Sequence, residues 1–351
     1  MRAEVQVTEP DAGTQWTQLA ARAIPALTTT SKAKREWKRG RLRLNGCLDV
    51  PTNVLTVAGD VIEYDDGMSD IASAKDMEVA DSRWFCMCQR QGLRVVFEND
   101  SLAVVMKPPG VHVKGRGPRT LESALPRLLR RRTVDGGRED ELPVPHAVHR
   151  LDYRVGGVLL VAKRRQAEVM LGAQFERHQV IKHYRALVVG RLQLDEQDEA
   201  PCGGLSTAIP TVESASPVRF ISTDIDGKTS CTALRIVDYS RSASYEWLTT
   251  VDLWPLTGRK HQLRLHLARV GHPIVGDDLY HIHVGEHTHQ AHIKAPVVRG
   301  VGLFLTAIGV AFDDEHGNRR SFAVAEPPKY DRFRHMCEYN WTKMQQLKEN
   351  R

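Results

Sequence analysis

The sequence predicts an α+β fold, with a mixed, mostly antiparallel sheet and a few flanking helices. Helical periodicity is confined to short stretches such as 120–132 and 164–177. Strand-like runs, separated by Asn-Asp or glycine-proline turns, are more numerous: 94–98, 102–106, 158–162, 184–189, a meander over 218–253, and a last hairpin of 302–310 with 320–324. Strands therefore do not alternate with helices, as they would in a doubly wound parallel sheet.

Length and composition limit the class of protein. A chain of 351 residues can bury one large core and a smaller companion core. A pI of about 9.0 and a formal charge of +6 favour a polyanionic partner. No apolar run approaches the roughly 18 residues of a membrane span, and the six scattered cysteines favour reduced thiols. We expect a soluble, cytoplasmic monomer, with an organelle or the nucleus left open.

The pattern changes along the chain and divides it into regions. A small basic unit comes first, then a stretch with little pattern, and then the long strand-rich region. The predicted regions are an N-terminal tail at 1–14, the basic unit at 15–65, a linker at 66–92, the main domain at 93–335 and a C-terminal tail at 336–351.

The basic unit contains a predicted helix that begins near Ser31 and ends at Gly40. Its cations recur at spacings of three and four residues, so they lie close together on the helix: Lys34, Arg35, Lys38 and Arg39. Cations this close together repel each other in the free protein, so their crowding favours a surface that binds the phosphates of a nucleic acid. The alternative, a solvated basic face, stays open.

The main domain is organised around the stretch from His149 to Gly157. Asp152 lies there between two arginines, in a glycine-rich turn that leads into the apolar run 158–162. Read alone, Asp152 is better explained as a turn residue or a surface ion-pair partner than as a catalytic group.

Two later stretches change that interpretation. They are Lys182–Gly190, with the pattern Lys-x-Tyr-x-Ala, and Leu256–Asp277, with Gly-Arg-Lys-His-Gln-Leu-Arg-Leu-His. Together with the Asp152 stretch, and with the Lys-Pro-Pro-Gly turn at 107–110, they resemble the RluA family of RNA pseudouridine synthases over roughly 95–328. The basic unit is similar to the S4-type RNA-binding domain found at the front of such enzymes.

The resemblance implies the pseudouridine synthase fold and a catalytic trio. Asp152 corresponds to the catalytic carboxylate, which attacks or stabilises the ribose or the base. Tyr184 corresponds to the tyrosine that stacks on the target base. Arg264 is implied to hold Asp152 in its ionised form, with a guanidinium that forks onto the carboxylate.

The same resemblance implies residues that bind the RNA. Because uracil must leave the helix to reach the pocket, Arg150 is implied to fill the vacated space and hold phosphates. Leu265 is expected to line the base pocket, and His149 and Arg259 are expected at the substrate site. The sequence leaves ribosomal, transfer and messenger RNA open as the substrate, and we expect neither a metal nor a cofactor.

Two departures leave alternatives open. The family usually has Thr-Ser-Gly where this chain has Val155-Gly156-Gly157, so two capping hydroxyls are absent and a looser loop is expected. Five histidines also gather after Tyr280: His281, His283, His287, His289 and His292. If they held zinc, a metal-dependent hydrolase would be a rival function. A second rival is a catalytically weak scaffold that only binds RNA.

Overall fold

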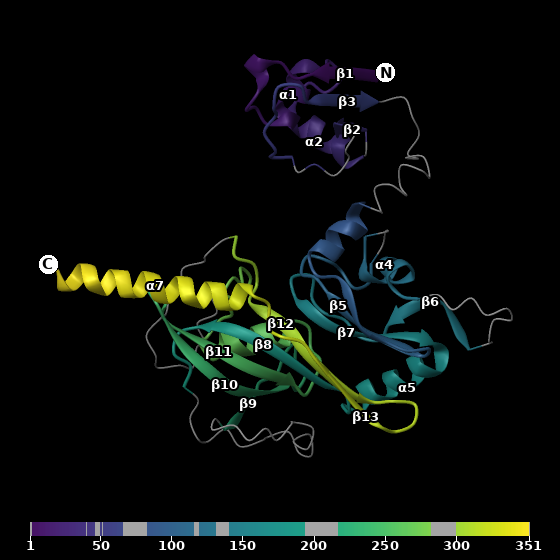
Figure 1. Cartoon of the computed structure of the whole chain (residues 1–351), viewed down its shortest axis with the longest axis vertical. Helices are drawn as coiled ribbons and strands as arrows, with labels where there is room; N and C mark the ends of the chain where they lie inside the picture. The colour runs from purple at the N-terminus through teal and green to yellow at the C-terminus, as the bar shows by residue number, and fades with distance from the viewer. Residues whose placement is uncertain are drawn as a thin grey trace. The chain divides into compact units, whose positions relative to one another are not determined.

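The computed structural model of the chain (Figure 1) describes residues 2–39, 41–45, 50, 52–65, 83–115, 119–130, 140–193, 217–281 and 300–350. The chain divides into two compact units, Met1–Met87 and Cys88–Arg351. The boundary falls inside the stretch predicted as a linker at 66–92, where residues 83–90 are helical.

The first unit is a three-stranded antiparallel sheet packed against two helices. The strand order is β1-β3-β2, and the elements are β1 (Arg2–Gln6), a 3-10 turn (Glu9–Asp11), α1 (Trp16–Ala23), α2 (Thr30–Lys38), β2 (Leu42–Leu44) and β3 (Val61–Asp65). The prediction of a tail at 1–14 is wrong, because β1 pairs with β3 along its whole length. Alternating side chains let this short strand cover the same core as Trp16.

The basic helix α2 begins and ends with side chains from its own sequence. Thr29 accepts a hydrogen bond from the Lys32 amide at the N-terminus, which satisfies a free helix donor. Glu36 is buried and pairs with Arg39 at 3.0 Å and with Arg41 at 3.5 Å. Part of the basic cluster therefore neutralises a buried acid and stabilises the unit.

The second unit is built on one large sheet. Its main strand order is β4-β5-β7-β12-β8-β11-β10-β9, with β13 paired to β12 and β6 to β7. The strands are β4 (Arg94–Glu98), β5 (Leu102–Lys107), β6 (Glu141–Ala147), β7 (Gly156–Arg164), β8 (Ile181–Val189), β9 (Val218–Ser222), β10 (Cys231–Ser242), β11 (Glu246–Pro255), β12 (Leu305–Asp313) and β13 (Arg319–Ala323). Every described pairing between these strands is antiparallel except that of β12 with β7, so the mixed α+β fold is confirmed.

The position of β12 decides where the functional residues meet. This late strand lies between β7 and β8, so that Ala307 faces Gly157 on one side and Tyr184 on the other. A Cβ on Gly157 would lie 2.2 Å from the Ala307 carbonyl oxygen, and its φ is +131°. Only glycine permits this approach of the two strands.

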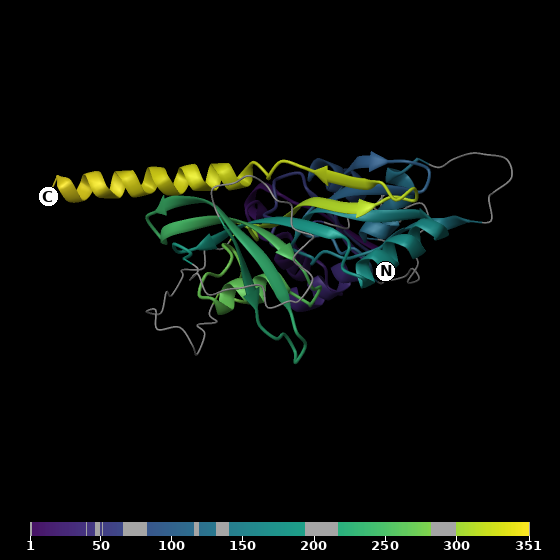
Figure 2. The ribbon, with the colours of Figure 1, turned by 90° about the horizontal axis from the view of Figure 1, so that it is seen from below.

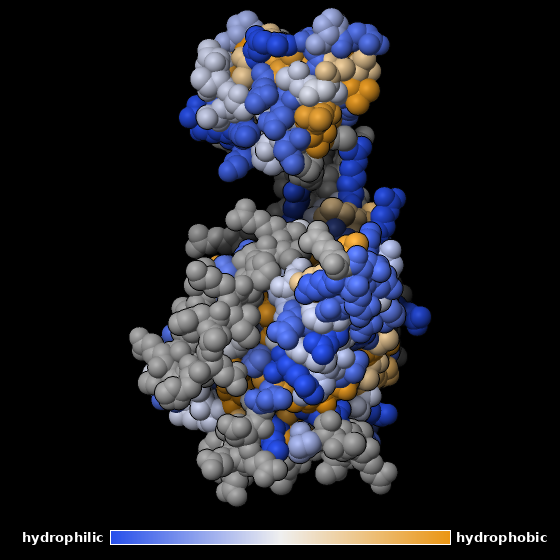
Figure 3. All heavy atoms as spheres, turned by 90° about the vertical axis from the view of Figure 1, so that its left-hand side faces the viewer, coloured by the Kyte–Doolittle hydropathy of each residue, from blue (hydrophilic) through white to orange (hydrophobic). Residues whose placement is uncertain are grey.

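Helices pack on or beside this sheet, as Figures 1 and 2 show. They are α4 (Leu121–Leu128), α5 (Arg165–Glu176), α6 (Gln262–Arg269) and α7 (Lys329–Glu349). The prediction of a tail from residue 336 is wrong, because α7 continues to Glu349 with Tyr330, Phe333 and Cys337 buried. In the face shown in Figure 3, hydrophilic residues cover most of the described surface. No helix in the described ranges is long and apolar enough to cross a membrane.

Candidate active site

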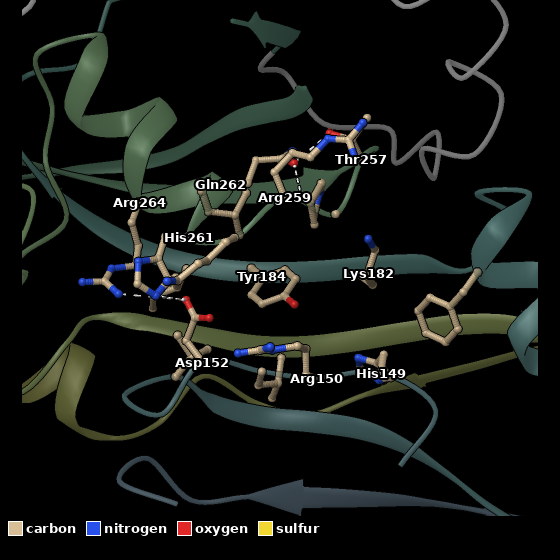
Figure 4. Close-up of a pocket in the computed structure, with 18 residues that line it drawn as sticks. His149, Arg150, Asp152, Lys182, Tyr184, Thr257, Arg259, His261, Gln262 and Arg264 are labelled. Carbon is tan, nitrogen blue, oxygen red and sulfur yellow. Dashed lines mark hydrogen bonds and ion pairs between the residues drawn. The ribbon is translucent and has the colours of Figure 1, made fainter. Parts of the chain in front are cut away.

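Asp152 lies in the turn before β7, on the wall of a cavity of about 500 Å³ (Figure 4). The amide of Val155 donates to the Asp152 carbonyl at 3.0 Å, and Val155 is itself buried. The turn is thus closed and anchored, while the Asp152 side chain keeps 21% of its surface exposed toward the cavity. This volume lies in the range of about 300–1,000 Å³ that is usual for ligand sites.

Arg264 reaches the cavity from α6, but its fork is not on Asp152. Its Nε and Nη2 donate to the two oxygens of Asp277 at 2.6 and 2.8 Å, whereas Nη1 lies 4.0 Å from Asp152 Oδ2. The predicted fork onto Asp152 is therefore wrong. Asp277 is the better partner because the amides of Leu279 and Tyr280 also donate to it.

Electrostatics keep this buried pair ionised. Although burial opposes both charges, the hydrogen bonds to Asp277 raise the pKa of Arg264, and those from Arg264 lower the pKa of Asp277. The guanidinium is also 4.9 Å from the ring centre of Tyr280. Arg264 is thus fixed on two sides, and its Nη1 amino group is left facing Asp152 at 4.0 Å.

Tyr184 and Lys182 enter the cavity from the same face of β8, because side chains two residues apart share a face of a strand. Burial, and then the negative charge of Asp152, raise the pKa of Tyr184, so its hydroxyl stays protonated at neutral pH. Burial lowers the pKa of Lys182 to about 8. The alternation of β8 therefore places a protonated phenol and a titratable amine in one pocket.

The loop before α6 forms the opposite wall. Gln262 accepts hydrogen bonds from the Thr257 hydroxyl at 2.7 Å and from the Arg259 amide at 3.0 Å, and it donates to the Cys231 carbonyl. This buried network fixes the loop. The Arg259 guanidinium donates to the Thr229 carbonyl and lines the cavity, where it was expected.

Leu265 does not line this cavity, so that prediction is wrong. Successive residues of a helix point about 100° apart, and the phase of α6 that turns Arg264 inward turns Leu265 away. The apolar lining includes Leu263 of α6 and Leu305 at the start of β12.

Sequence comparison identifies relatives of this site and fold. Residues 101–269 match the family model described as RNA pseudouridylate synthase. The dual-specificity RNA pseudouridine synthase RluA of Vibrio vulnificus is 33% identical over 187 residues, which are 53% of this chain and 68% of that protein. The chain belongs to the RluA family of RNA pseudouridine synthases. It is therefore an RNA-modifying isomerase.

Other relatives cover more of the synthase. The ribosomal large subunit pseudouridine synthase D of Vibrio cholerae is 28% identical over 289 residues, which are 80% of this chain and 78% of that one. A solved human structure, RNA Pseudouridylate Synthase Domain Containing 1, superposes with a TM-score of 0.48 at 22% identity, over 68% of this chain and 84% of that one.

Two further predicted residues of the synthase also line the cavity, with different surroundings. Arg150 is exposed at its rim. His149 is held from within the fold: its Nε2 accepts the Leu160 amide at 3.0 Å, and its ring centre lies 4.9 Å from that of Phe175. Burial and the nearby Lys182 ammonium lower the pKa of His149 to about 3, so the ring is neutral and suits a structural role.

Sequence reasoning did not identify three residues of the synthase that surround Asp152. His261 Nε2 lies 3.8 Å from Asp152 Oδ2, and its Nδ1 is 2.8 Å from the Tyr280 hydroxyl. Lys182 could have been found from its two-residue spacing to Tyr184. Lys107, fully buried beneath the loop, begins the Lys-Pro-Pro-Gly turn of the resemblance, but that pattern alone does not place its amine near Asp152.

The described ranges contain no group of three metal-ligating side chains. The histidine cluster raised a zinc site as an alternative, but His283, His287, His289 and His292 lie outside the described residues. The ionisable side chains that line the Asp152 cavity include one carboxylate, several cations and a phenol.

Proposed function

We propose that this synthase converts specific uridines of RNA to pseudouridine with Asp152 as the catalytic carboxylate. The observation that carries the proposal is the meeting of Asp152, Tyr184 and Arg264, from three separate stretches of chain, in one cavity. The reaction breaks the bond from the ribose to a ring nitrogen and forms one to a ring carbon. That carbon loses its proton and the freed nitrogen gains one, so no redox partner is needed.

Each member of the trio has a role that its environment supports. The Asp152 carboxylate attacks or stabilises the sugar or the base while the glycosidic bond is open. Arg264 Nη1 and His261 Nε2 lie 4.0 and 3.8 Å from Asp152 Oδ2, so the guanidinium attracts the carboxylate and helps to hold it in position. Tyr184, whose phenol stays neutral, packs against the detached uracil while it turns.

The RNA must present its uridine outside the helix, since the cavity admits only a flipped nucleotide. Arg150 and Arg259 are suited to hold the phosphates beside it, and Lys182 adds a cation inside the pocket. The first unit is proposed as an S4-like RNA-binding domain that docks through Lys34, Lys38 and their neighbours.

We propose ribosomal RNA as the first substrate to test, on the printed name of the Vibrio cholerae relative. Transfer and messenger RNA are the other substrate classes. We also propose that the protein is a monomer in a reducing, cytoplasmic compartment. The free thiols of Cys86, Cys88, Cys231 and Cys337 support the reducing compartment.

The test is chemical mapping of pseudouridine in total cellular RNA, from cells with the wild-type protein, without it, and with Asp152→Asn. We expect at least one uridine to be modified only in the presence of the wild type. The Asn variant should bind that RNA within a few fold of wild type, because the phosphate contacts stay. Substantial turnover by the Asn variant would remove Asp152 from its role, and RNA binding without turnover by the wild type would favour the scaffold alternative.

A further inference from the structure

The residue after the catalytic carboxylate is an exposed aromatic. The Tyr153 side chain is 49% exposed, although large aromatic side chains usually gain by burial. Its ring centre lies 4.6 Å from that of His112, with a tilt of 35° between the planes. Two rings from different loops thus meet beside Asp152.

A second cavity of about 430 Å³ extends along these rings. It shares with the active-site cavity the wall formed by His149, Arg150, Leu151, Asp152 and His261, and it is bounded further on by His112, Lys114 and Tyr153. The segment from Arg150 to Asp152 therefore separates two adjacent hollows. One leads to Tyr184, and the other leads to the paired rings.

Backbone contacts fix the two loops that carry the rings. The Gly110 amide donates to the Tyr153 carbonyl at 2.7 Å, and the Leu121 amide donates to the His112 carbonyl at 2.8 Å. From beneath, the fully buried Lys107 amine donates to the carbonyls of Pro108 and Val111 at 3.0 and 2.8 Å. Because the backbone of both loops is already held in this way, little backbone entropy is lost when a ligand packs on the rings.

We infer that the paired rings of Tyr153 and His112 form a stacking platform for the nucleotide next to the target uridine. The inference rests on the proposed function and adds a specificity-determining element to it. When the uridine flips out, its neighbour loses a stacking partner and exposes an aromatic face. A rigid, exposed phenol next to the carboxylate replaces that partner, and Arg150 lies between the two nucleotides, within reach of the phosphate that joins them.

Charge supports a nucleotide over an apolar ligand in this second cavity. Arg150 is an exposed cation on its wall, and Lys114 is a second cation, 3.3 Å from Glu122. A side chain that served packing alone would be covered, as Leu151 and Val155 are on either side of it. The face of Tyr153 instead opens where an RNA strand must leave the active site.

The test uses a short RNA that carries a uridine modified by the wild type, with single-turnover and steady-state kinetics. Because the stack exists in the bound state before chemistry, Tyr153→Ala should raise KM roughly tenfold and change kcat by less than about twofold. Tyr153→Phe and Tyr153→Trp keep a stacking face and should behave as wild type. Tyr153→Leu keeps apolar bulk without a planar ring and should resemble the Ala variant.

A second perturbation on the RNA makes the test specific. An abasic residue on one side of the target uridine should raise KM for the wild type by the same factor, and it should add nothing to the defect of Tyr153→Ala. The matched control is Tyr339→Ala, since Tyr339 on α7 is also an exposed tyrosine of this unit. It should leave KM unchanged, and thermal unfolding checks that each variant is folded.

Two results would overturn this inference but leave the proposed function standing. One is a wild-type KM in folded Tyr153→Ala and Tyr153→Leu. The other is that Tyr153→Ala and the abasic residue raise KM independently, whichever side of the target uridine the abasic residue occupies. If the wild type modifies no uridine in any RNA pool, the proposed function fails as well. The two failures are therefore distinguishable.

Discussion

Arg264→Lys tests whether a fixed guanidinium is needed beside Asp152. Arg264 satisfies Asp277 with two nitrogens and keeps a third at 4.0 Å from Asp152. A lysine has a single nitrogen and cannot reach both carboxylates. Because Asp277 also holds two backbone amides, we expect the ammonium to remain with Asp277 and to withdraw from Asp152.

The magnitude follows from the distances. With an effective dielectric constant of about 20, a unit charge at 4 Å interacts by about 4.2 kcal/mol, and at about 6 Å by about 2.8 kcal/mol. The difference, about 1.4 kcal/mol, corresponds to about a tenfold slower chemical step if the guanidinium stabilises the transition state by that amount. Loss of one hydrogen bond in the buried pair should also lower the free energy of unfolding by about 1–3 kcal/mol.

The assay is the single-turnover rate of pseudouridine formation at saturating enzyme, with urea unfolding measured in parallel. Arg269→Lys is the matched control, since Arg269 is on the same helix but donates to the Thr223 hydroxyl and the Asp224 carbonyl instead. That variant should keep the wild-type rate. A wild-type rate in folded Arg264→Lys would refute the reasoning and make Arg264 a purely structural residue.

Three further predictions follow from the structure. Lys182, with its pKa lowered to about 8, loses its charge in the folded protein as pH rises through 8, so the KM for RNA should rise between pH 7 and 9 in the wild type but stay flat in Lys182→Met. Gly157→Ala should lower the free energy of unfolding by about 3 kcal/mol, because its Cβ would meet the carbonyl of Ala307; urea unfolding measures this, and a stable variant would contradict the close approach of β7 and β12. Changing the exposed Lys34 and Lys38 to Ala should reduce the salt slope of RNA binding by about two units, and an unchanged slope would assign α2 to stability of the first unit.

The resemblance to the family led us to expect Asp152 and Tyr184 in one site, and local pattern explains how each side chain is placed. A glycine-rich turn ahead of an apolar run places Asp152 at the rim of a sheet, and two-residue alternation orients Tyr184. The partner of Arg264 was not predictable in this way. Asp152 and Asp277 both lie in the stretches that carry the resemblance, and only the three-dimensional geometry shows which of them also receives backbone amides.

The pairing of strands that are far apart in the sequence also cannot be predicted from local patterns. The strand run near 305 was evident, but nothing in it indicates insertion between β7 and β8, which brings Leu305 into the cavity wall. The ends of the chain were misread for a related reason. β1 is a five-residue strand, too short to give a firm period. In α7, the exposed polar residues after Phe333 obscured the buried side chain of Cys337.

The loop around Asp152 shows how one sequence can replace a family's local hydrogen bonds with packing. The absence of hydroxyls at Val155 and Gly156 led us to expect a looser loop, but the loop has other restraints. Val155 is buried, and Arg154 donates to the Gly276 carbonyl at 2.9 Å, which ties the loop to the segment after α6. A Cβ at position 156 would lie only 3.0 Å from Pro109 Cδ, so the serine of the family pattern would crowd this turn. The position of Asp152 therefore depends on close contact beneath the loop, where a side chain at position 156 would have to displace Pro109 by a few tenths of an ångström.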